Sequence, residues 1–391
     1  MPLLSVIIPT HNRAHCAISA IKSTLSISDD IQVVVSDSSD IDLITPEFKD
    51  WNDPKRLKFV RHNEPISVVD NFNSALQAAD GEYLLFIGDD DFVSSEVVSL
   101  AQWAKANDVD SLKFSFPALY YWPNFKHATR GDVYAGTLHI APFTGKISAH
   151  NAQDALTYAL NNFGGGVFEM PRAYAGMLSS TLAKKIIGKY GSLFGGVSPD
   201  IYSSALISTE ASNCMHIDFP IIIPGASGQS TTGQSAVGGH RGELRANPHI
   251  SAFKNLIWDD RIPEFYSVPT VWSFSLLKAV EEIAKQNENR VITPNFGRLI
   301  LKCLAYHPDE MENTLVSFRI LREKYGSAFI LWQLTSALFS EFAWGIGRIK
   351  NRIVARYIKQ NIYVADNLNT TFDANNHLHD YLLSHTQKIN L

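Results

Sequence analysis

The N-terminal part of the chain alternates between short apolar runs and segments whose apolar residues recur with helical spacing. The apolar runs are rich in β-branched or aromatic residues and end at polar or turn-forming residues, which is typical of buried strands. Helical spacing in residues 14–25 and 68–79 predicts a helix in each segment. The predicted strands are residues 3–8, 31–35, 57–61 and 83–87.

The order strand, helix, strand, strand, helix, strand predicts an α/β fold with a largely parallel sheet. Ligands of such sheets bind outside the carboxyl ends of the strands. Polar residues follow three of the predicted strands, at residues 10–13, at Asp37 and at residues 89–91. The pattern therefore predicts a site built from these three loops.

The pattern is less regular in the middle of the chain. Residues 113–145 are rich in aromatic side chains and predict no particular element, whereas residues 153–162 and 179–190 have helical spacing. A strand-like run occupies residues 217–223. Residues 225–242 are rich in Gly, Ser and Thr and predict a long loop, and loops of that length in compact domains are usually functional or disordered.

Beyond about residue 250 the pattern becomes helical, with residues 329–359 forming one long helix or two. We therefore divide the chain into a domain of residues 1–245, whose halves are residues 1–110 and 111–245, and a helical region of residues 246–391. The other helices predicted in that region are residues 271–286, 298–307 and 311–325.

Composition narrows the class of protein. The net charge of −5 argues against a nucleic-acid binder, which usually carries a basic surplus. The three cysteines form no CxxC pair, so they indicate neither a zinc knuckle nor a disulfide framework and fit a reducing compartment. We see no signal peptide and no spanning segment, and expect a cytoplasmic protein.

Three adjacent carboxylates, Asp89, Asp90 and Asp91, follow the last predicted strand. Their mutual repulsion is unfavourable unless a cation offsets it. Mg²⁺ and Mn²⁺ prefer oxygen ligands and often bridge a carboxylate to a phosphate, which favours a metal between Asp91 and a diphosphate. The competing interpretation is a solvated acidic turn that caps a helix beginning near Ser94.

The other two loops carry groups that suit a nucleotide. The carboxylate of Asp37 can accept a hydrogen bond from a base or a ribose, although an Asp among serines also suits a loop that only closes on itself. Thr10, Asn12 and Arg13 can bond a base and a phosphate. A lone Arg at that place is equally typical of an exposed, solvated residue.

These segments, SVIIPTHNR, VVVSDSSD and NSALQAADGEYLLFIGDDD, occur in one register over about the first 100 residues and resemble the N-terminal half of family 2 glycosyltransferases with the GT-A fold. The resemblance implies a Rossmann-like, mostly parallel sheet flanked by helices, with residues 1–110 as the nucleotide-sugar half, residues 111–245 as the acceptor half and a helical C-terminal extension. It also implies inverting, metal-dependent transfer from a nucleotide diphosphate sugar, most often a UDP-sugar, to a glycan or polyprenyl-linked hydroxyl.

The resemblance also implies roles for single residues on the nucleotide side. Pro9, Thr10 and Arg13 would line the base pocket, and Asp37 would contact the nucleobase. Asn73 occupies the place of an Asn that the family commonly has on the nucleotide side. One departure is Ser-Asp-Ser-Ser at residues 36–39, where the family usually has Asp-Asp-Gly-Ser.

For the diphosphate and the metal, the resemblance implies that Asp91 is the main metal ligand and that Asp89 and Asp90 face the ribose or diphosphate, with Asp89 also near the metal. Gly88 stands where the family usually has the first Asp of its DxD-type motif. His240 would complete the shell of Mn²⁺ or Mg²⁺, since some members use a C-terminal His and neutral imidazole suits Mn²⁺. An exposed loop histidine is the alternative.

The catalytic base must come from the second half, and the segment GGVSPDIYSS resembles the family's Pro-Asp segment. Asp200 would then deprotonate the acceptor hydroxyl. A helix N-terminus lowers the pKa of a carboxylate, so this group would be ionised. The alternative is that Asp200 is only an N-cap. Glu169 and Arg172 either face the acceptor or form structural salt bridges.

The last signal is a basic, amphipathic stretch at residues 342–360. Such a helix can lie on an anionic membrane, which suits a lipid-linked acceptor at the inner face of the plasma membrane. Packing on its own domain or a homodimer contact would produce the same pattern.

The resemblance favours a surface polysaccharide such as O-antigen or capsule as the product. Two other functions stay open: a non-catalytic nucleotide- or carbohydrate-binding module on the same fold, and a sugar-phosphate nucleotidyltransferase. The latter would normally show a Gly-rich loop with Arg and Lys after the first strand, which is missing here. A dinucleotide-binding oxidoreductase is disfavoured because no GxGxxG follows that strand.

Overall fold

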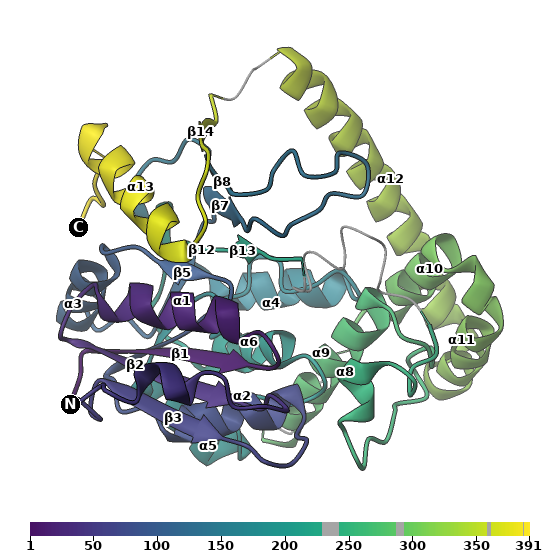
Figure 1. The fold of residues 1–391 in the computed structure, drawn as a ribbon. Helices are drawn as coiled ribbons and strands as arrows, with labels where there is room; N and C mark the ends of the chain where they lie inside the picture. The colour runs from purple at the N-terminus through teal and green to yellow at the C-terminus, as the bar shows by residue number, and fades with distance from the viewer. Residues whose placement is uncertain (229–241, 287–292, 358–360, 386) are drawn as a thin grey trace.

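A computed structural model describes the chain except for residues 229–241, 287–292, 358–360 and 386 (Figure 1). His240 and the segment around it therefore lie outside the described residues. Within α12, nothing is described of the side chains of residues 343–344 and 349–357.

The centre of the molecule is an eight-stranded sheet in the order β3-β2-β1-β4-β10-β6-β11-β9. The first four strands run parallel, and β11 runs parallel to β6, while β10 and β9 are antiparallel to their neighbours. The α/β fold with a mostly parallel sheet flanked by helices is thus confirmed. The strands are β1 (Leu4–Thr10), β2 (Ile31–Asp37), β3 (Leu57–Arg61), β4 (Tyr83–Phe86), β6 (Ser111–Phe114), β9 (Ile147–Ala149), β10 (Met177–Ser179) and β11 (Cys214–Ile217).

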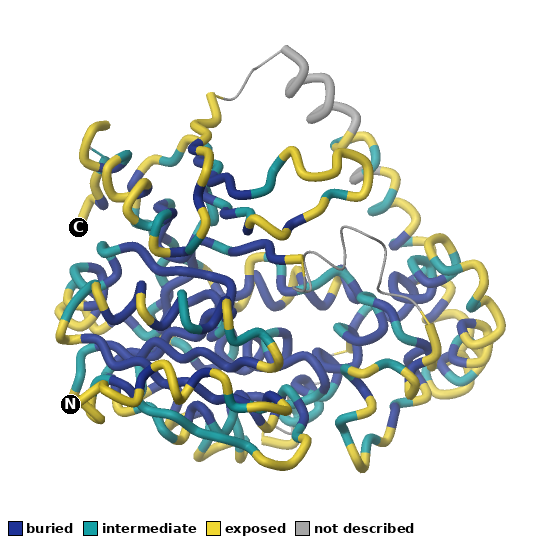
Figure 2. Tube along the Cα trace, viewed as in Figure 1, coloured by how far each residue is buried: buried dark blue, intermediate teal, exposed yellow. Residues whose placement is uncertain are grey.

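Both faces of this sheet are covered, which explains why its strands are continuous apolar runs. All seven residues of β1 are buried, and successive side chains enter opposite cores: Ile7 packs in one, Val6 and Ile8 in the other. Figure 2 shows the sheet as the most deeply buried part of the chain. One core is covered by α2 (Val68–Gln77), α4 (Ala152–Asn161), α5 (Ser180–Tyr190), α6 (Pro199–Glu210) and α9 (Val268–Lys285), the other by α1 (Ala14–Leu25), α3 (Val97–Ala106) and α13 (Thr371–Ser384).

Residues 113–145, for which the pattern predicted no element, contribute to a smaller sheet in the order β13-β7-β8-β14. Its strands are only two to four residues long, which is too short for a clear period in the sequence. Two further strands form a separate pair. These elements are β7 (Ala118–Tyr121), β8 (Thr137–Ile140), β13 (Gly225–Ala226) and β14 (Tyr363–Ala365), and the pair β5 (Phe92–Val93) and β12 (Ile222–Ile223).

The C-terminal region is mainly helical, as expected, and the long helical pattern near its end is one helix, α12 (Ser327–Tyr357), which leaves the body of the molecule in Figure 1. No described helix is long and apolar enough to cross a membrane. The chain then returns, since β14 pairs with β8 and α13 packs on α1. The boundary at residue 245 stays a prediction. The remaining elements are η1 (Thr45–Phe48), α8 (Pro248–Ser251), α10 (Phe296–Tyr306), η2 (Pro308–Glu310) and α11 (Met311–Tyr325).

Candidate active site

The three polar loops predicted from the sequence meet at the carboxyl ends of β1, β2 and β4. Thr10 at the end of β1 pairs in register with Asp37 at the end of β2, while β4 lies on the other side of β1 and leads into Gly88 and the Asp triplet. The parallel register thus brings residues that are 79 positions apart into contact: the hydroxyl of Thr10 donates a hydrogen bond of 2.6 Å to Oδ2 of Asp89.

Arg13 forms ion pairs with the acidic cluster and is not a free, solvated side chain. Its Nη2 lies 2.5 Å from Oδ1 of Asp89, and its Nη1 lies 3.3 Å from Oδ2 of Asp90. Asp90 is also held by the hydroxyl of Ser227, which donates a bond of 2.9 Å. The triplet is therefore a buried, cross-linked cluster, and its interpretation as a solvated acidic turn is wrong.

Asp91 is held by the backbone alone. One oxygen accepts the N–H of Gly88 and the other the N–H of Gly225, both at 2.8 Å. A Cβ on Gly88 would lie 2.8 Å from the hydroxyl of Tyr174 and 2.9 Å from Oδ2 of Asp91. This close approach explains why a glycine precedes the triplet.

Burial and mutual repulsion disfavour the ionised form of the carboxylates in this cluster. Burial, with repulsion from Asp90, raises the pKa of Asp91 to about 7 against the two backbone hydrogen bonds. Burial raises the pKa of Asp89 to about 7 as well, although Arg13 opposes the shift. One guanidinium faces three carboxylates, so the site favours an additional cation.

Asp37 is buried beside the carboxyl end of β1. Its Oδ1 accepts the N–H of Ser39 at 2.9 Å, and its Oδ2 lies 3.3 Å from Nη1 of Arg61. That Oδ2 accepts no hydrogen bond from the described residues. Pro9, also buried, pairs with Ser36 one residue earlier in the same register.

Asn71 is the residue of this site that sequence reasoning missed. Its Nδ2 lies 3.4 Å from the carbonyl of Thr10 and 3.4 Å from the hydroxyl of Ser38, while its buried Oδ1 has no hydrogen-bond partner among the described residues. The sequence carries only a weak signal for it, namely that Asn71 and Ala75 form an i, i+4 row next to the apolar face of α2.

Asn73 points elsewhere. Both atoms of its side-chain amide bond to the backbone of Phe194, 121 residues away, at 3.0 and 3.3 Å. In the structure it therefore fixes the loop before α6, and its assigned contact with the nucleotide stays a prediction.

Asp200 lies in the first turn of α6, but the N-cap is Ser198, so the interpretation of Asp200 as an N-cap is wrong. The hydroxyl of Ser198 donates a bond of 2.9 Å to Oδ1 of Asp200. Asp200 interacts electrostatically with Arg172, Arg172 with Tyr174, and Tyr174 with all three carboxylates of the triplet. Arg172 and Tyr174 therefore lie between the charge of Asp200 and the charges of the triplet in this series of interactions.

Glu169 and Arg172 behave differently. Glu169 forms a salt bridge of 2.6 Å with Nζ of Lys113, which lowers the pKa of Glu169. Of the two interpretations of Glu169, the structural salt bridge is therefore the one that the structure shows. Arg172 forms no ion pair with any described residue, and its guanidinium lies 5.4 Å from the centre of the Phe116 ring.

The cluster supplies the ligand chemistry of a hard divalent cation, although no three His, Cys, Asp or Glu side chains among the described residues are placed to hold one by themselves. Magnesium-type sites commonly use one or two carboxylates together with substrate phosphates. Asp91 and Asp89 fit such a shared shell. Whether His240 joins it stays a prediction.

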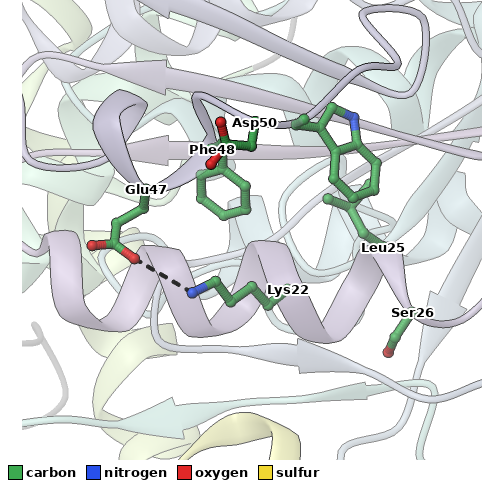
Figure 3. A pocket seen from close by; sticks show the side chains of 7 residues that line it. Lys22, Leu25, Ser26, Glu47, Phe48 and Asp50 are labelled. Carbon is green, nitrogen blue, oxygen red and sulfur yellow. Dashed lines mark ion pairs between the residues drawn. The ribbon is translucent and has the colours of Figure 1, made fainter.

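A pocket of about 430 Å³ lies elsewhere, between α1 and η1 (Figure 3). It is flanked by the ion pair of Lys22 and Glu47, whose atoms are 3.5 Å apart. Lys22 and Leu25 are in the last turn of α1, whereas Arg13 precedes its first turn. The pocket therefore sits at the opposite end of α1 from the acidic cluster and contributes nothing to it.

Comparison with known proteins identifies the family of the N-terminal part. Residues 5–146 match the family described as glycosyl transferase family 2. A GalNAc(5)-diNAcBac-PP-undecaprenol beta-1,3-glucosyltransferase of Campylobacter jejuni is 35% identical over 111 residues, which span 28% of this chain and only 36% of that relative.

Two solved structures are similar at low identity. S. aureus TarS (residues 1–349, in complex with UDP-GlcNAc) is 16% identical, with 79% of this chain and 73% of that chain covered at a TM-score of 0.43. Mannosyltransferase PcManGT from Pyrobaculum calidifontis, in complex with GDP-Man and Mn²⁺, is 12% identical, with 87% and 88% covered at a TM-score of 0.35. Both likenesses are too weak to carry an argument about the site.

Proposed function

We propose that this chain, whose residues 5–146 match glycosyl transferase family 2, transfers a sugar from a nucleotide diphosphate sugar to a hydroxyl of a glycan or lipid-linked acceptor. In this proposal the donor is a UDP-sugar, and the product is a surface polysaccharide such as O-antigen or capsule. The observation that carries it is the buried cluster of Asp89, Asp90 and Asp91, in which a single guanidinium offsets three carboxylates.

The nucleoside binds at the ends of β1 and β2. Two buried oxygens there, Oδ2 of Asp37 and Oδ1 of Asn71, accept no hydrogen bond from the described residues. Buried polar atoms are nearly always satisfied, so donors on a bound base would complete them. Thr10 and Arg13 support the site by orienting Asp89.

The diphosphate faces the acidic cluster. Asp91 and Asp89 would hold Mn²⁺ or Mg²⁺ there, and the bound ion would offset negative charge on the leaving diphosphate. The backbone N–H groups of Gly88 and Gly225 fix the Asp91 carboxylate, so its orientation does not depend on a flexible side-chain partner. Ser227 bonds Asp90 and so connects the cluster to the segment that precedes residue 229.

Asp200 acts as the general base in a single displacement with inversion. It removes the proton of the acceptor hydroxyl while that oxygen attacks the anomeric carbon from the face opposite the leaving group. The hydroxyl of Ser198 fixes one carboxylate oxygen at 2.9 Å and leaves the other available for the proton.

The acceptor is lipid-linked, and α12 brings the enzyme to the membrane that carries it. The relative from Campylobacter jejuni is named for an undecaprenol-linked substrate. Phe339, Phe342 and Ile346 of α12 are exposed. The sequence from residue 342 to 365 contains no acidic residue but five basic ones, which suits an anionic lipid surface. The basic residues are Arg348, Lys350, Arg352, Arg356 and Lys359.

A donor screen by calorimetry tests the proposal. UDP-, GDP-, dTDP- and CMP-sugars are titrated into the full chain with Mn²⁺ or with chelator. We expect one donor to bind only with metal, and Asp91→Ala to abolish that binding. Asp260→Ala removes an exposed carboxylate and serves as the matched control. Binding of no donor, or binding indifferent to metal and to Asp91, would contradict the proposal.

A further inference from the structure

Arg172 is fixed beside the strand that leads to the acidic cluster. The segment after it runs along the end of β4: the N–H of Phe86 donates to the carbonyl of Ala173 at 3.3 Å, and the N–H of Ala175 donates to the carbonyl of Phe86 at 2.7 Å. Two residues beyond Phe86 the chain reaches Gly88 and the triplet. The position of Arg172 is therefore set by the sheet rather than by a mobile loop.

The guanidinium of Arg172 lies against the ring of Phe116, 5.4 Å from its centre. Within the described chain it makes no hydrogen bond and has no carboxylate oxygen within 4 Å of its nitrogens. The nearest candidate in the sequence, Glu169, is already paired with Lys113 at 2.6 Å. Burial lowers the pKa of Arg172, while Asp200 and Glu169 act against that shift from a greater distance.

An unpaired, partly buried guanidinium is exceptional among the residues that the structure describes. Removing a charge from water is unfavourable unless the charge is paired. Each of the other described arginines that is not exposed has a carboxylate partner within 4 Å. Those arginines are Arg13, Arg56, Arg61, Arg261 and Arg298.

We propose that Arg172 binds a phosphate group of the sugar acceptor and so holds the acceptor hydroxyl next to Asp200. A guanidinium resting on an aromatic ring keeps its N–H edges free, and those edges match two phosphate oxygens at once. The inference rests on the proposed function, because it assigns the anion to the acceptor. The placement supports that assignment: Phe116 follows β6 and Asp200 begins α6, both in residues 111–245, whereas the donor diphosphate faces Asp91.

The test uses phenyl phosphate as the probe and benzyl alcohol as its neutral counterpart, with binding to the full chain followed by saturation-transfer NMR. We expect wild type to bind phenyl phosphate and not benzyl alcohol. Arg172→Gln should weaken binding by about 10-fold or more, since it removes a charge-assisted hydrogen bond. Arg172→Lys should weaken it less, because the charge remains. Arg322→Gln, which removes the same charge from exposed α11, should change nothing.

A second arm repeats the titration with saturating UDP and Mn²⁺. Retained binding of the probe supports an acceptor site, and displacement by UDP would show that Arg172 serves the donor and would overturn the inference. Equal binding by wild type and by an Arg172→Gln variant with unchanged thermal unfolding would overturn it too. Because the first titration contains no nucleotide, failure of UDP to bind would count against the proposed function separately.

Discussion

At the residue scale, the acidic cluster makes stability depend on pH in an unusual direction. The pKa values of Asp89 and Asp91 rise from 3.8 to about 7 on folding, so the native state holds protons that the unfolded chain has already lost. The free energy of unfolding contributed by these groups is therefore largest at acidic pH and falls as pH rises from about 4 to about 7. Above that pH range, a bound divalent cation should offset the repulsion between the carboxylates and so compensate for the loss of stability.

We accordingly expect Mn²⁺ to raise the midpoint of thermal unfolding more at pH 8 than at pH 5.5, relative to chelator at the same pH. Protons compete with the cation for the carboxylates at the lower pH. Scanning calorimetry measures both shifts. In a variant with Asp89→Asn and Asp91→Asn the difference should disappear, and an equal Mn²⁺ shift at both values of pH would contradict the argument.

The second prediction at this scale concerns the proposed base. Asp200→Asn should lower kcat by about 10²- to 10⁴-fold, because the amide cannot accept the proton of the hydroxyl. The KM for the donor should stay within about 3-fold. Transfer from a radiolabelled donor to a polyprenyl-linked glycan provides the measurement. Ser198→Ala keeps the carboxylate and should retain most of the activity; a fully active Asp200→Asn enzyme would exclude Asp200 as the base.

The sequence was sufficient to predict where some of the site residues lie, but not where others lie. It predicted that Thr10, Arg13 and Asp89 lie at adjacent strand ends, because parallel strands align their carboxyl ends. It could not predict that Arg13 pairs with two carboxylates or that Asn73 bonds to Phe194, because these contacts depend on how distant loops pack. Asn71 was missed because burial on a helix face is weakly encoded when the residue is polar.

At the element scale, β13 is the strand through which the second half of the chain contacts the Asp triplet. Gly225 donates its N–H to Asp91, and an added Cβ would lie 1.8 Å from the carbonyl oxygen of Asp90. That atom belongs to the backbone, so the clash cannot be relieved by a side-chain rotation. The sequence did not predict short strands such as β13 and β7. It did predict β1, β2 and β4, because each lies in a continuous apolar run.

Gly225→Ala should therefore destabilise the fold by about 1–3 kcal/mol, as overpacking does, and weaken metal-dependent donor binding. Gly188→Ala is the matched control, because Gly188 lies within α5 and nothing is within 4 Å of its added Cβ. That change should stabilise by up to about 1 kcal/mol. Denaturant unfolding of the two variants measures the contrast, and equal effects would contradict the assigned clash.

At the scale of the whole molecule, the C-terminal segment packs against the N-terminal part of the chain. The hydroxyls of Ser19 and Thr371 lie 2.8 Å apart, which connects α1 to α13. Leu378 of α13 is fully buried in the core that contains α1, whereas Leu383 is 65% exposed. The sequence predicted α9, α10, α11 and α12 but neither α13 nor this return of the chain, which involves pairing across more than 200 residues.

Leu378→Ala should cost about 2–5 kcal/mol of unfolding free energy, because it leaves a cavity beneath α1. Leu383→Ala on the same helix should stay within about 0.5 kcal/mol. Denaturant titration gives both values. Similar small losses for the two variants would mean that α13 does not contribute to the core.

The membrane contact of α12 is also a property of the whole molecule. We expect the full chain to sediment with phosphatidylglycerol vesicles and not with phosphatidylcholine vesicles, because the sequence around the exposed face is basic. Combining Phe339→Ser with Phe342→Ser should reduce that binding by about 10-fold or more. Phe372→Ser, which changes an exposed side chain of α13, should leave it unchanged. A shift to a monomer in the double variant without any vesicle binding by wild type would indicate a dimer helix instead.

The contact between α1 and α13 has a consequence for biosynthesis. The partners in the Ser19–Thr371 contact are 352 residues apart, and ribosomes add about 5–20 residues per second. The surface of α1 and β5 against which α13 packs therefore stays uncovered for tens of seconds after its own synthesis, until α13 emerges. During that interval the nascent N-terminal half exposes an apolar surface. Chaperones that bind apolar surfaces should therefore stay bound far longer to ribosome-stalled chains ending before residue 371 than to the released full-length protein.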